Sequence, residues 1–94
     1  MSFSNYLHSR LHSFGNIKKN GLYYHYKSKN YNRKIYKVLN LAIQEGNIEN
    51  ILVVYEEQFG DRMIWARNLN EWNEEVLDEY GYKSKRFIPL FNNE

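Results

Sequence analysis

The run Ile-Leu-Val-Val-Tyr at residues 51–55 constrains the fold more than any other feature of this sequence. It is the only long stretch of β-branched and aliphatic side chains, and polar turn residues bound it on both sides. A run of this length and composition is typical of a strand that is buried on both faces. Because strands of mixed character are expected on either side, we expect residues 50–56 to form the centre of a small antiparallel sheet.

The chain has 94 residues and 0 Cys, which excludes both disulfide bonds and thiolate metal sites. A single domain of this size buries only about 60–65% of the surface that its unfolded chain exposes, so its core needs large side chains. The 9 Tyr, 5 Phe and 2 Trp, together 17% of the sequence, supply them. The fold therefore has to hold by packing alone.

Apolar side chains that recur every three or four residues predict a short helix over residues 4–14. Gly and Asn turn signals separate five predicted strands, over residues 22–27, 34–43, 50–56, 63–67 and 86–88. A bend is expected near Asn40, where the second strand carries apolar residues on both faces. Asn68 is expected to cap a helical turn over residues 69–72, above Val76 and Leu77, and Pro89 restricts the last strand to a sheet edge.

These patterns predict a mainly β (α+β) fold, a small antiparallel barrel or half-open β roll with a short N-terminal helix. Closing the sheet would remove the exposed edges that a flat sheet of this size leaves. We expect an N-terminal helix and linker over residues 1–20, the small β domain over residues 21–91 and a tail over residues 92–94.

Short motifs occur in a definite order between residues 21 and 87 and resemble the bacterial family called domain of unknown function 1653. The resemblance implies a compact, mostly β domain of the SH3-like small-barrel type, and it implies no activity because none is assigned to that family. The chain departs from the family pattern at Asn68, where the family has a proline, and in the loop at residues 44–47. The motifs are Gly21-x-Tyr23-x-His25-Tyr26-Lys27, Tyr36-x-Val38-Leu39-x-x-Ala42, Leu52-Val53-Val54-Tyr55, Gly60, Trp65-x-Arg67 and Arg86-Phe87.

The formal net charge is only +2, but the charges are unevenly distributed. Residues 18–37 carry basic and no acidic side chains, whereas residues 71–79 carry acidic and no basic ones. Such a layout can steer an anion to one end of the molecule, although two ordinary solvated faces are the alternative. No segment approaches the roughly 20 apolar residues that span a bilayer, and the N-terminus lacks signal-peptide features, so we expect a cytoplasmic protein with no membrane contact.

The tyrosines are too many for so small a core to hide with every hydroxyl paired, so some are expected at the surface. Exposed rings beside Lys and Arg suit nucleotides, because rings stack on bases and cations bind phosphates. The predicted ligand-binding residues are Tyr24, His25, Tyr26, Lys27, Lys29, Arg33, Trp65 and Arg67.

The sequence therefore favours a non-catalytic binding module for an anionic nucleotide-type ligand or a nucleic-acid segment. The alternative is a protein-interaction module, which would form a homodimer or bind a partner protein through the same aromatic strip or through the helix face of Leu7, Leu11 and Phe14.

An enzyme centred on His25 is a third hypothesis, but no nucleophile with a base and an orienting group accompanies this histidine, so we predict no catalytic residue. His8 and His12 have the spacing of two metal ligands on a helix. Two ligands alone bind a metal weakly, and we predict neither a metal site nor a cofactor.

Overall fold

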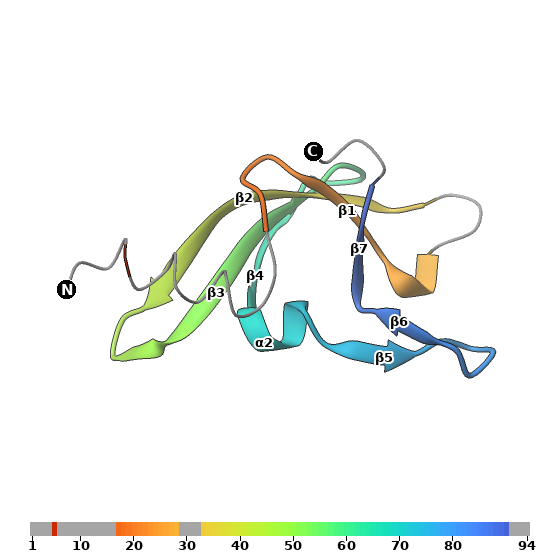
Figure 1. Ribbon diagram of the computed structural model, residues 1–94. Coiled ribbons are helices and arrows are strands. Elements are labelled where there is room, and N and C mark those ends of the chain that lie inside the picture. The colour runs from red at the N-terminus through yellow and green to blue at the C-terminus, as the bar shows by residue number, and fades with distance from the viewer. Residues whose placement is uncertain (1–4, 6–16, 29–32, 91–94) are drawn as a thin grey trace.

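The computed structural model describes residues 5, 17–28 and 33–90. Its main sheet is antiparallel with the strand order β4-β3-β2-β1-β7, and β5 pairs with β6 in a separate hairpin (Figure 1). The elements are β1 (Leu22–His25), the 3₁₀ turn η1 (Tyr26–Ser28), β2 (Ile35–Gln44), β3 (Asn47–Glu57), β4 (Ile64–Asn68), α2 (Leu69–Trp72), β5 (Glu75–Leu77), β6 (Lys83–Lys85) and β7 (Phe87–Pro89).

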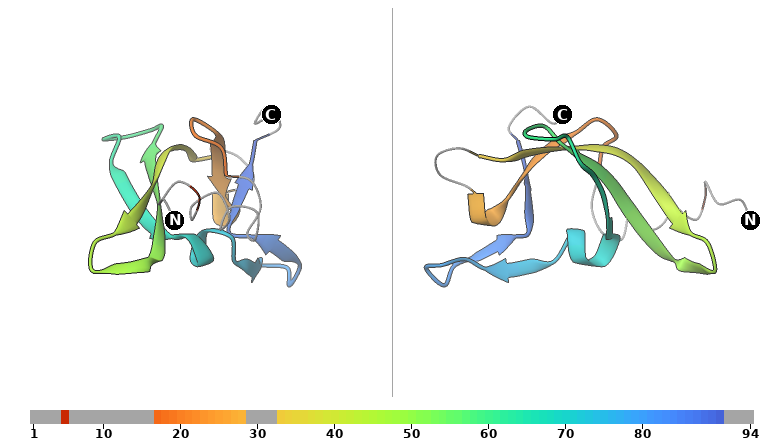
Figure 2. Two further views of the ribbon diagram at one scale, coloured as in Figure 1. Left: turned by 60° about the vertical axis from the view of Figure 1, so that its left-hand side comes forward. Right: turned by 180° about the vertical axis from the view of Figure 1, so that it is seen from behind.

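The fold is mostly β, which confirms that part of the predicted fold class, but the described strands form no closed barrel. β4 and β7 stand at opposite ends of the strand order and do not pair with each other, so the sheet stays open. The sheet curves strongly, and α2 and the β5–β6 hairpin lie on its concave side (Figure 2). The predicted helix over residues 4–14, apart from Asn5, and the predicted tail over residues 92–94 lie outside the described residues.

β2 and β3 form a long hairpin that turns at Glu45 and Gly46. Gly46 has a φ of 85°, a left-handed conformation that glycine adopts without strain. The pairing register shifts between Val38 and Asn40, which places a β-bulge where the sequence predicted a bend. The bulge re-aims the side chains that follow it, so apolar residues on both sides of it face the core.

The aliphatic run at residues 51–55 lies in β3 as predicted, but two expectations about it are wrong. β2, not β3, occupies the middle of the strand order. Ile51, Val53 and Tyr55 are buried, whereas Leu52 and Val54 are only partly buried. Alternate residues of a strand point to opposite faces, so only the concave face of β3 is fully covered by the core.

The core centres on Trp72, whose side chain is 2% exposed. Its ring stacks on Phe87 with centroids 3.9 Å apart and an interplanar angle of 6°. Tyr23 and Tyr55 close around it, with centroids at 5.3 and 5.0 Å. Because these rings come from α2, β7, β1 and β3, this cluster ties the curved sheet to the short helix. The whole cluster comprises Ile17, Tyr23, Val38, Ile51, Val53, Tyr55, Leu69, Trp72 and Phe87.

Asn68 caps α2 as predicted, because its side-chain oxygen accepts a hydrogen bond from the backbone N–H of Asn70 at 2.7 Å. Leu69 and Trp72 lie three positions apart on this helix, so both side chains point into the core. In the described part of the chain, no helix is long and apolar enough to cross a membrane.

The sequence did not predict the β5–β6 hairpin. In its turn, Oδ1 of Asp78 accepts hydrogen bonds from the backbone N–H groups of Tyr80 and Tyr82 at 2.9 and 3.0 Å. Leu77 was expected to pack beneath the helical turn, but it is 64% exposed. The expectation was wrong because this segment pairs with β6 instead of folding back under α2.

The two tryptophans provide a matched test of the core. Trp72→Ala should lower the free energy of unfolding by about 3–5 kcal/mol, because it leaves a cavity among the core rings. Trp65→Ala should cost less than about 1 kcal/mol, because this side chain is 48% exposed. Urea unfolding followed by circular dichroism measures both changes, and equal losses would contradict the place given to Trp72.

Candidate functional site

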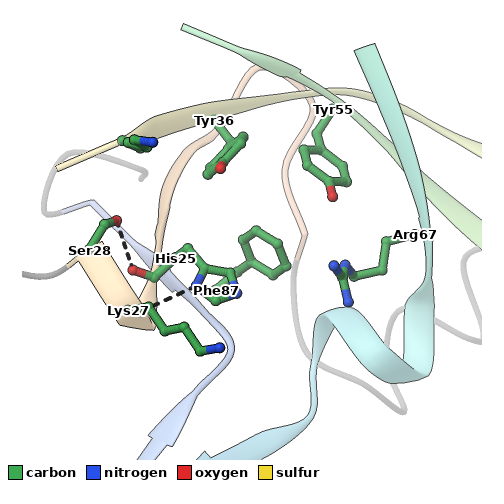
Figure 3. Close-up of a pocket in the computed structure, with 8 residues that line it drawn as sticks. His25, Lys27, Ser28, Tyr36, Tyr55, Arg67 and Phe87 are labelled. Atoms are coloured by element: carbon green, nitrogen blue, oxygen red, sulfur yellow. Dashed lines mark hydrogen bonds between the residues drawn. The ribbon is translucent and has the colours of Figure 1, made fainter. Parts of the chain in front are cut away.

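A cavity of about 430 Å³ opens on the concave side of the sheet. Its size falls within the range of about 300–1,000 Å³ that is typical of small-molecule sites. Figure 3 shows Arg67 and Tyr55 on one side of it, and His25, Lys27 and Ser28 on the other. The described residues that line it are His25, Lys27, Ser28, Lys34, Tyr36, Tyr55, Arg67 and Phe87.

Strand pairing brings these side chains together although they are distant in sequence. His25 on β1 pairs directly with Phe87 on β7. Tyr55 on β3 pairs with Val38 on β2 and with Trp65 on β4. Tyr36 lies two residues before Val38, and Arg67 lies two residues after Trp65. Paired residues, and residues two apart along a strand, share a face of the sheet. The register therefore places all five side chains on the concave face.

Phe87 lies at the centre of the aromatic part of the cavity. The rings of Tyr36, Tyr55 and His25 have their centroids 5.9, 5.5 and 5.3 Å from the Phe87 centroid, and all three are turned edge-to-face toward it. Tyr36 is half-buried and also meets Tyr55 edge-on at 5.5 Å. Edge-to-face contacts of this kind are favourable, so the rings hold one another in place.

His25 presents a neutral imidazole to this cavity. The backbone N–H of Lys27 donates to its Nδ1 at 3.3 Å, so the proton of the neutral ring resides on Nε2. Burial, and then the positive charges of Arg67, Arg86 and Lys27, lower the pKa of His25 to about 4. Near neutral pH the side chain therefore offers one N–H donor and no charge.

Arg67 points its guanidinium group toward the cavity (Figure 3). Its Cζ atom lies 5.6 Å from the centroid of Phe87. Its Nε atom is buried and has no hydrogen-bond partner, and Nη1 lies 3.5 Å from Oε2 of the exposed Glu71. An exposed ion pair of this length contributes at most about 1 kcal/mol, so Arg67 retains most of its capacity to bind another anion.

The polar groups that line the cavity are mainly hydrogen-bond donors. Lys27, Lys34 and Arg67 are cationic, and none of the described lining residues is Asp or Glu. Burial, and then the nearby Tyr55 and Glu57, raise the pKa of the Tyr36 hydroxyl, with Arg67 opposing them. This hydroxyl therefore stays protonated and can donate. Such a lining is complementary to a ligand with several negatively charged oxygen atoms.

Of the predicted ligand-binding residues, His25, Lys27 and Arg67 line the cavity. The guanidinium of Arg33 lies 4.4 Å from the ring centroid of Tyr24, which faces away from the cavity because it alternates with His25 along β1. Tyr26 stacks obliquely on His25 with centroids 4.7 Å apart. None of Tyr24, Tyr26, Arg33 and Trp65 is a lining residue, and Lys29 lies outside the described residues.

Trp65 lies on the edge strand β4, beside the cavity and not in its lining. Its indole N–H donates to Oε2 of Glu57 at 3.0 Å. The other carboxylate oxygen of Glu57 accepts from the backbone N–H of Met63 at 3.2 Å. This carboxylate is therefore held by neighbouring donors and leaves the lining cations to other partners.

Sequence reasoning missed Ser28, Lys34, Tyr36, Tyr55 and Phe87 as site residues. Ser28 is held by its hydroxyl group, which donates to the backbone oxygen of His25 at 3.0 Å. A signal was present for three of the others, since the quoted family motifs include Tyr36, Tyr55 and Phe87. Only the strand register shows that these motifs meet at one place.

The described residues contain no group of three or more His, Asp or Glu side chains that could hold a metal ion. The pair His8 and His12 lies outside the described residues. The cavity itself offers one neutral imidazole among cations, which disfavours a metal cation for electrostatic reasons.

The comparisons with known proteins give one family. The sequence model of a family described as "Protein of unknown function (DUF1653)" matches residues 21–89. The chain belongs to this family. No curated protein matches the chain, and no solved structure matches it either.

The match confirms the resemblance that the motifs indicated, and it spans every DUF1653 motif that the sequence analysis quoted. Two groups stand out among the motif residues in the structure. Tyr23, Val38 and Val53 belong to the buried core. The other group lines the cavity and comprises His25, Lys27, Tyr36, Tyr55, Arg67 and Phe87. Tyr55 and Phe87 belong to the core as well.

The pKa of His25 tests the electrostatics of the cavity. An NMR titration of its ring proton should give a pKa of about 4 in the folded protein. Arg67→Gln should raise this pKa without restoring the ordinary value of 6.5, because burial remains the larger cause. A titration near 6.5 in the unaltered protein would contradict the described environment.

The lowered pKa of His25 also sets the direction in which the stability of the fold changes with pH. Between pH 6.5 and about 4 the unfolded chain binds a proton at His25 that the folded chain excludes. Acidification through this window should therefore destabilise the fold, and His25→Phe should reduce that dependence. Urea midpoints at several pH values measure the effect.

Proposed function

We propose that this protein is a non-catalytic binding module for an anionic, nucleotide-type ligand. One observation carries the proposal: the cavity combines Lys27, Lys34 and Arg67 with aromatic walls, and no described lining residue is acidic. Phosphate oxygens suit the cations, and a planar base suits the half-buried rings of Tyr36 and His25.

The volume supports a nucleotide over a simple anion. Inorganic phosphate would leave most of a 430 Å³ cavity filled with water, whereas a ring attached to the phosphate would use the aromatic walls as well. A cavity of this size also suits one nucleotide unit and not a long stretch of nucleic acid. A nucleic-acid ligand would therefore insert a single base and its phosphate.

Isothermal titration calorimetry with the nucleoside 5′-monophosphates of all four bases tests this function. At least one monophosphate should bind more tightly than its nucleoside and more tightly than inorganic phosphate. Raising the salt from about 0.05 to about 0.5 M should weaken that binding, because charge interactions are screened. Arg67→Gln should weaken it by about tenfold or more, since a charge-assisted hydrogen bond is lost.

Lys19→Gln is the matched control, because it removes the same charge from an exposed position at the opposite end of β1 from His25. It should leave the affinity nearly unchanged. Equal losses in Arg67→Gln and Lys19→Gln would mean that net charge and not the cavity attracts the nucleotide. Failure of every monophosphate to bind would remove the proposed function.

A second function, self-association, is favoured by the exposed edge of β4. Ile64 on this edge is 57% exposed. The backbone N–H of Glu57 donates to the carbonyl of Met63 at 2.9 Å, and hydrogen-bonded pairs alternate along an antiparallel ladder. Ile64 and Ala66 therefore turn their backbone N–H and C=O groups to the open edge. An antiparallel pairing centred on Ala66 of two copies would satisfy these groups symmetrically.

Ile64→Lys should abolish such a dimer, because a charge on an edge strand opposes strand pairing. Leu77→Lys is the control, since it places the same charge on an equally exposed residue of the β5–β6 hairpin. Light scattering over a range of concentrations should show a dimer for the unaltered protein and for Leu77→Lys, and a monomer for Ile64→Lys. An unaltered protein that stays monomeric at high concentration excludes this pairing.

A further inference from the structure

The cations of the cavity lie at two ends and not around one point. One end holds Arg67, beside Tyr55 on β3 (Figure 3). The other end holds His25 and Lys27 at the end of β1, and Lys34 just before β2 begins. Phe87 lies between the two ends, 5.6 Å from Cζ of Arg67 and 5.3 Å from the His25 ring. Each end therefore has its own positive charge, with aromatic side chains between them.

Strand register shows how far apart the ends are. Arg67 on β4 pairs with Val53 on β3, whereas Tyr36 on β2 pairs with Glu57 on β3, and these two pairs define two levels along β3. These backbone levels are four residues apart, about 13 Å along β3 at about 3.3 Å per residue, and the side chains of the curved sheet bring the two ends nearer to each other than their backbones are. Lys34 lies two residues beyond Tyr36, in the direction away from Arg67. Its ammonium group lies 5.5 Å from the ring centroid of Phe59, at the end remote from Arg67.

A single phosphate is better matched by the cations of one end than by those of both ends together. Two donors that share a phosphate lie within roughly 8 Å of each other, given hydrogen bonds of about 2.9 Å. A ligand with a single phosphate at the Arg67 end would leave Lys27 and Lys34 without an anionic partner, and the reverse holds for a phosphate at the other end. A ligand that carries two separated anionic groups matches the full set of lining cations.

We propose that the cavity binds a nucleoside that bears a phosphate at each end, with its ring against the aromatic middle of the site. This inference rests on the proposed nucleotide-binding function and specifies the class of nucleotide. The shared chemistry occurs in a free nucleoside 3′,5′-bisphosphate and in an internal nucleotide of a single strand. Arg67 binds one phosphate, and Lys27 and Lys34 bind the other.

Calorimetry with the full chain tests the proposal, using the 5′-monophosphate, 5′-diphosphate and 3′,5′-bisphosphate of the best-binding nucleoside. The diphosphate and the bisphosphate each carry two phosphate groups, but only the bisphosphate places them at opposite ends. The bisphosphate should bind about tenfold more tightly than the diphosphate, since a second set of charge-assisted hydrogen bonds forms. The double variant Lys27→Gln, Lys34→Gln should remove this advantage, so that the diphosphate and the bisphosphate bind it with nearly equal affinity.

Arg67→Gln, by contrast, should weaken all three nucleotides, and Lys19→Gln should weaken none. Equal affinities for the diphosphate and the bisphosphate would overturn the two-ended site while the proposed function stands. An absence of binding by all three nucleotides would overturn both.

A single-stranded pentanucleotide of the same base identifies the source of the ligand. Tighter binding than the bisphosphate, with the same sensitivity to the lysine double variant, supports an internal nucleotide of a strand. Weaker binding than the bisphosphate supports the free molecule.

Discussion

The stack of Trp72 on Phe87 is the contact on which both the core and the cavity depend. The two rings lie nearly parallel with centroids 3.9 Å apart, and they join α2 to the edge strand β7. Parallel stacks are less favourable electrostatically than edge-to-face pairs, so this one relies on the apolar area that it removes from water. Through Phe87 the same contact supports the aromatic middle of the cavity, which places the candidate site directly on the core.

The cavity adds little to the stability of the fold. Its cations have few acidic partners among the described residues, and burial of His25 disfavours the charged form of that side chain. Uncompensated positive charges repel one another, and a buried donor without a partner, such as Nε of Arg67, is costly. Such an arrangement is expected where binding was favoured over stability. An anionic ligand would remove these costs, because it supplies both negative charge and hydrogen-bond acceptors.

Local features of the fold could be predicted from the sequence, whereas its long-range order could not. The cap at Asn68, the bend near Asn40 and the edge position of Pro89 follow from backbone chemistry within a few residues, and the structure confirms them. The central place of β2 depends on which strands pair, and no local pattern specifies this. The β5–β6 hairpin was missed because each of its strands has only three residues, which is too short for an alternating pattern to be recognised.

The candidate site illustrates the same limit. Tyr24 and Tyr26 were chosen as surplus surface rings beside basic residues, but alternation along β1 turns Tyr24 to the other face. Tyr36 and Phe87 were passed over because they are distant in sequence, and pairing of β1 with β2 and β7 brings them to His25. Composition could indicate the chemistry of aromatic rings beside cations, but only the strand register could indicate which rings and which cations share a face.

The distribution of the DUF1653 motif residues argues that the cavity is more than a packing defect. Motif residues such as Val38 and Val53 are apolar and buried, and packing alone accounts for them. Packing does not account for His25, Lys27 and Arg67, since each brings a hydrogen-bond donor or a charge to a cavity that apolar side chains would fill at lower cost. They come from β1, η1 and β4, so a single local constraint cannot explain their convergence. A shared anionic ligand, as proposed, would explain it, because one ligand would contact all three elements at once.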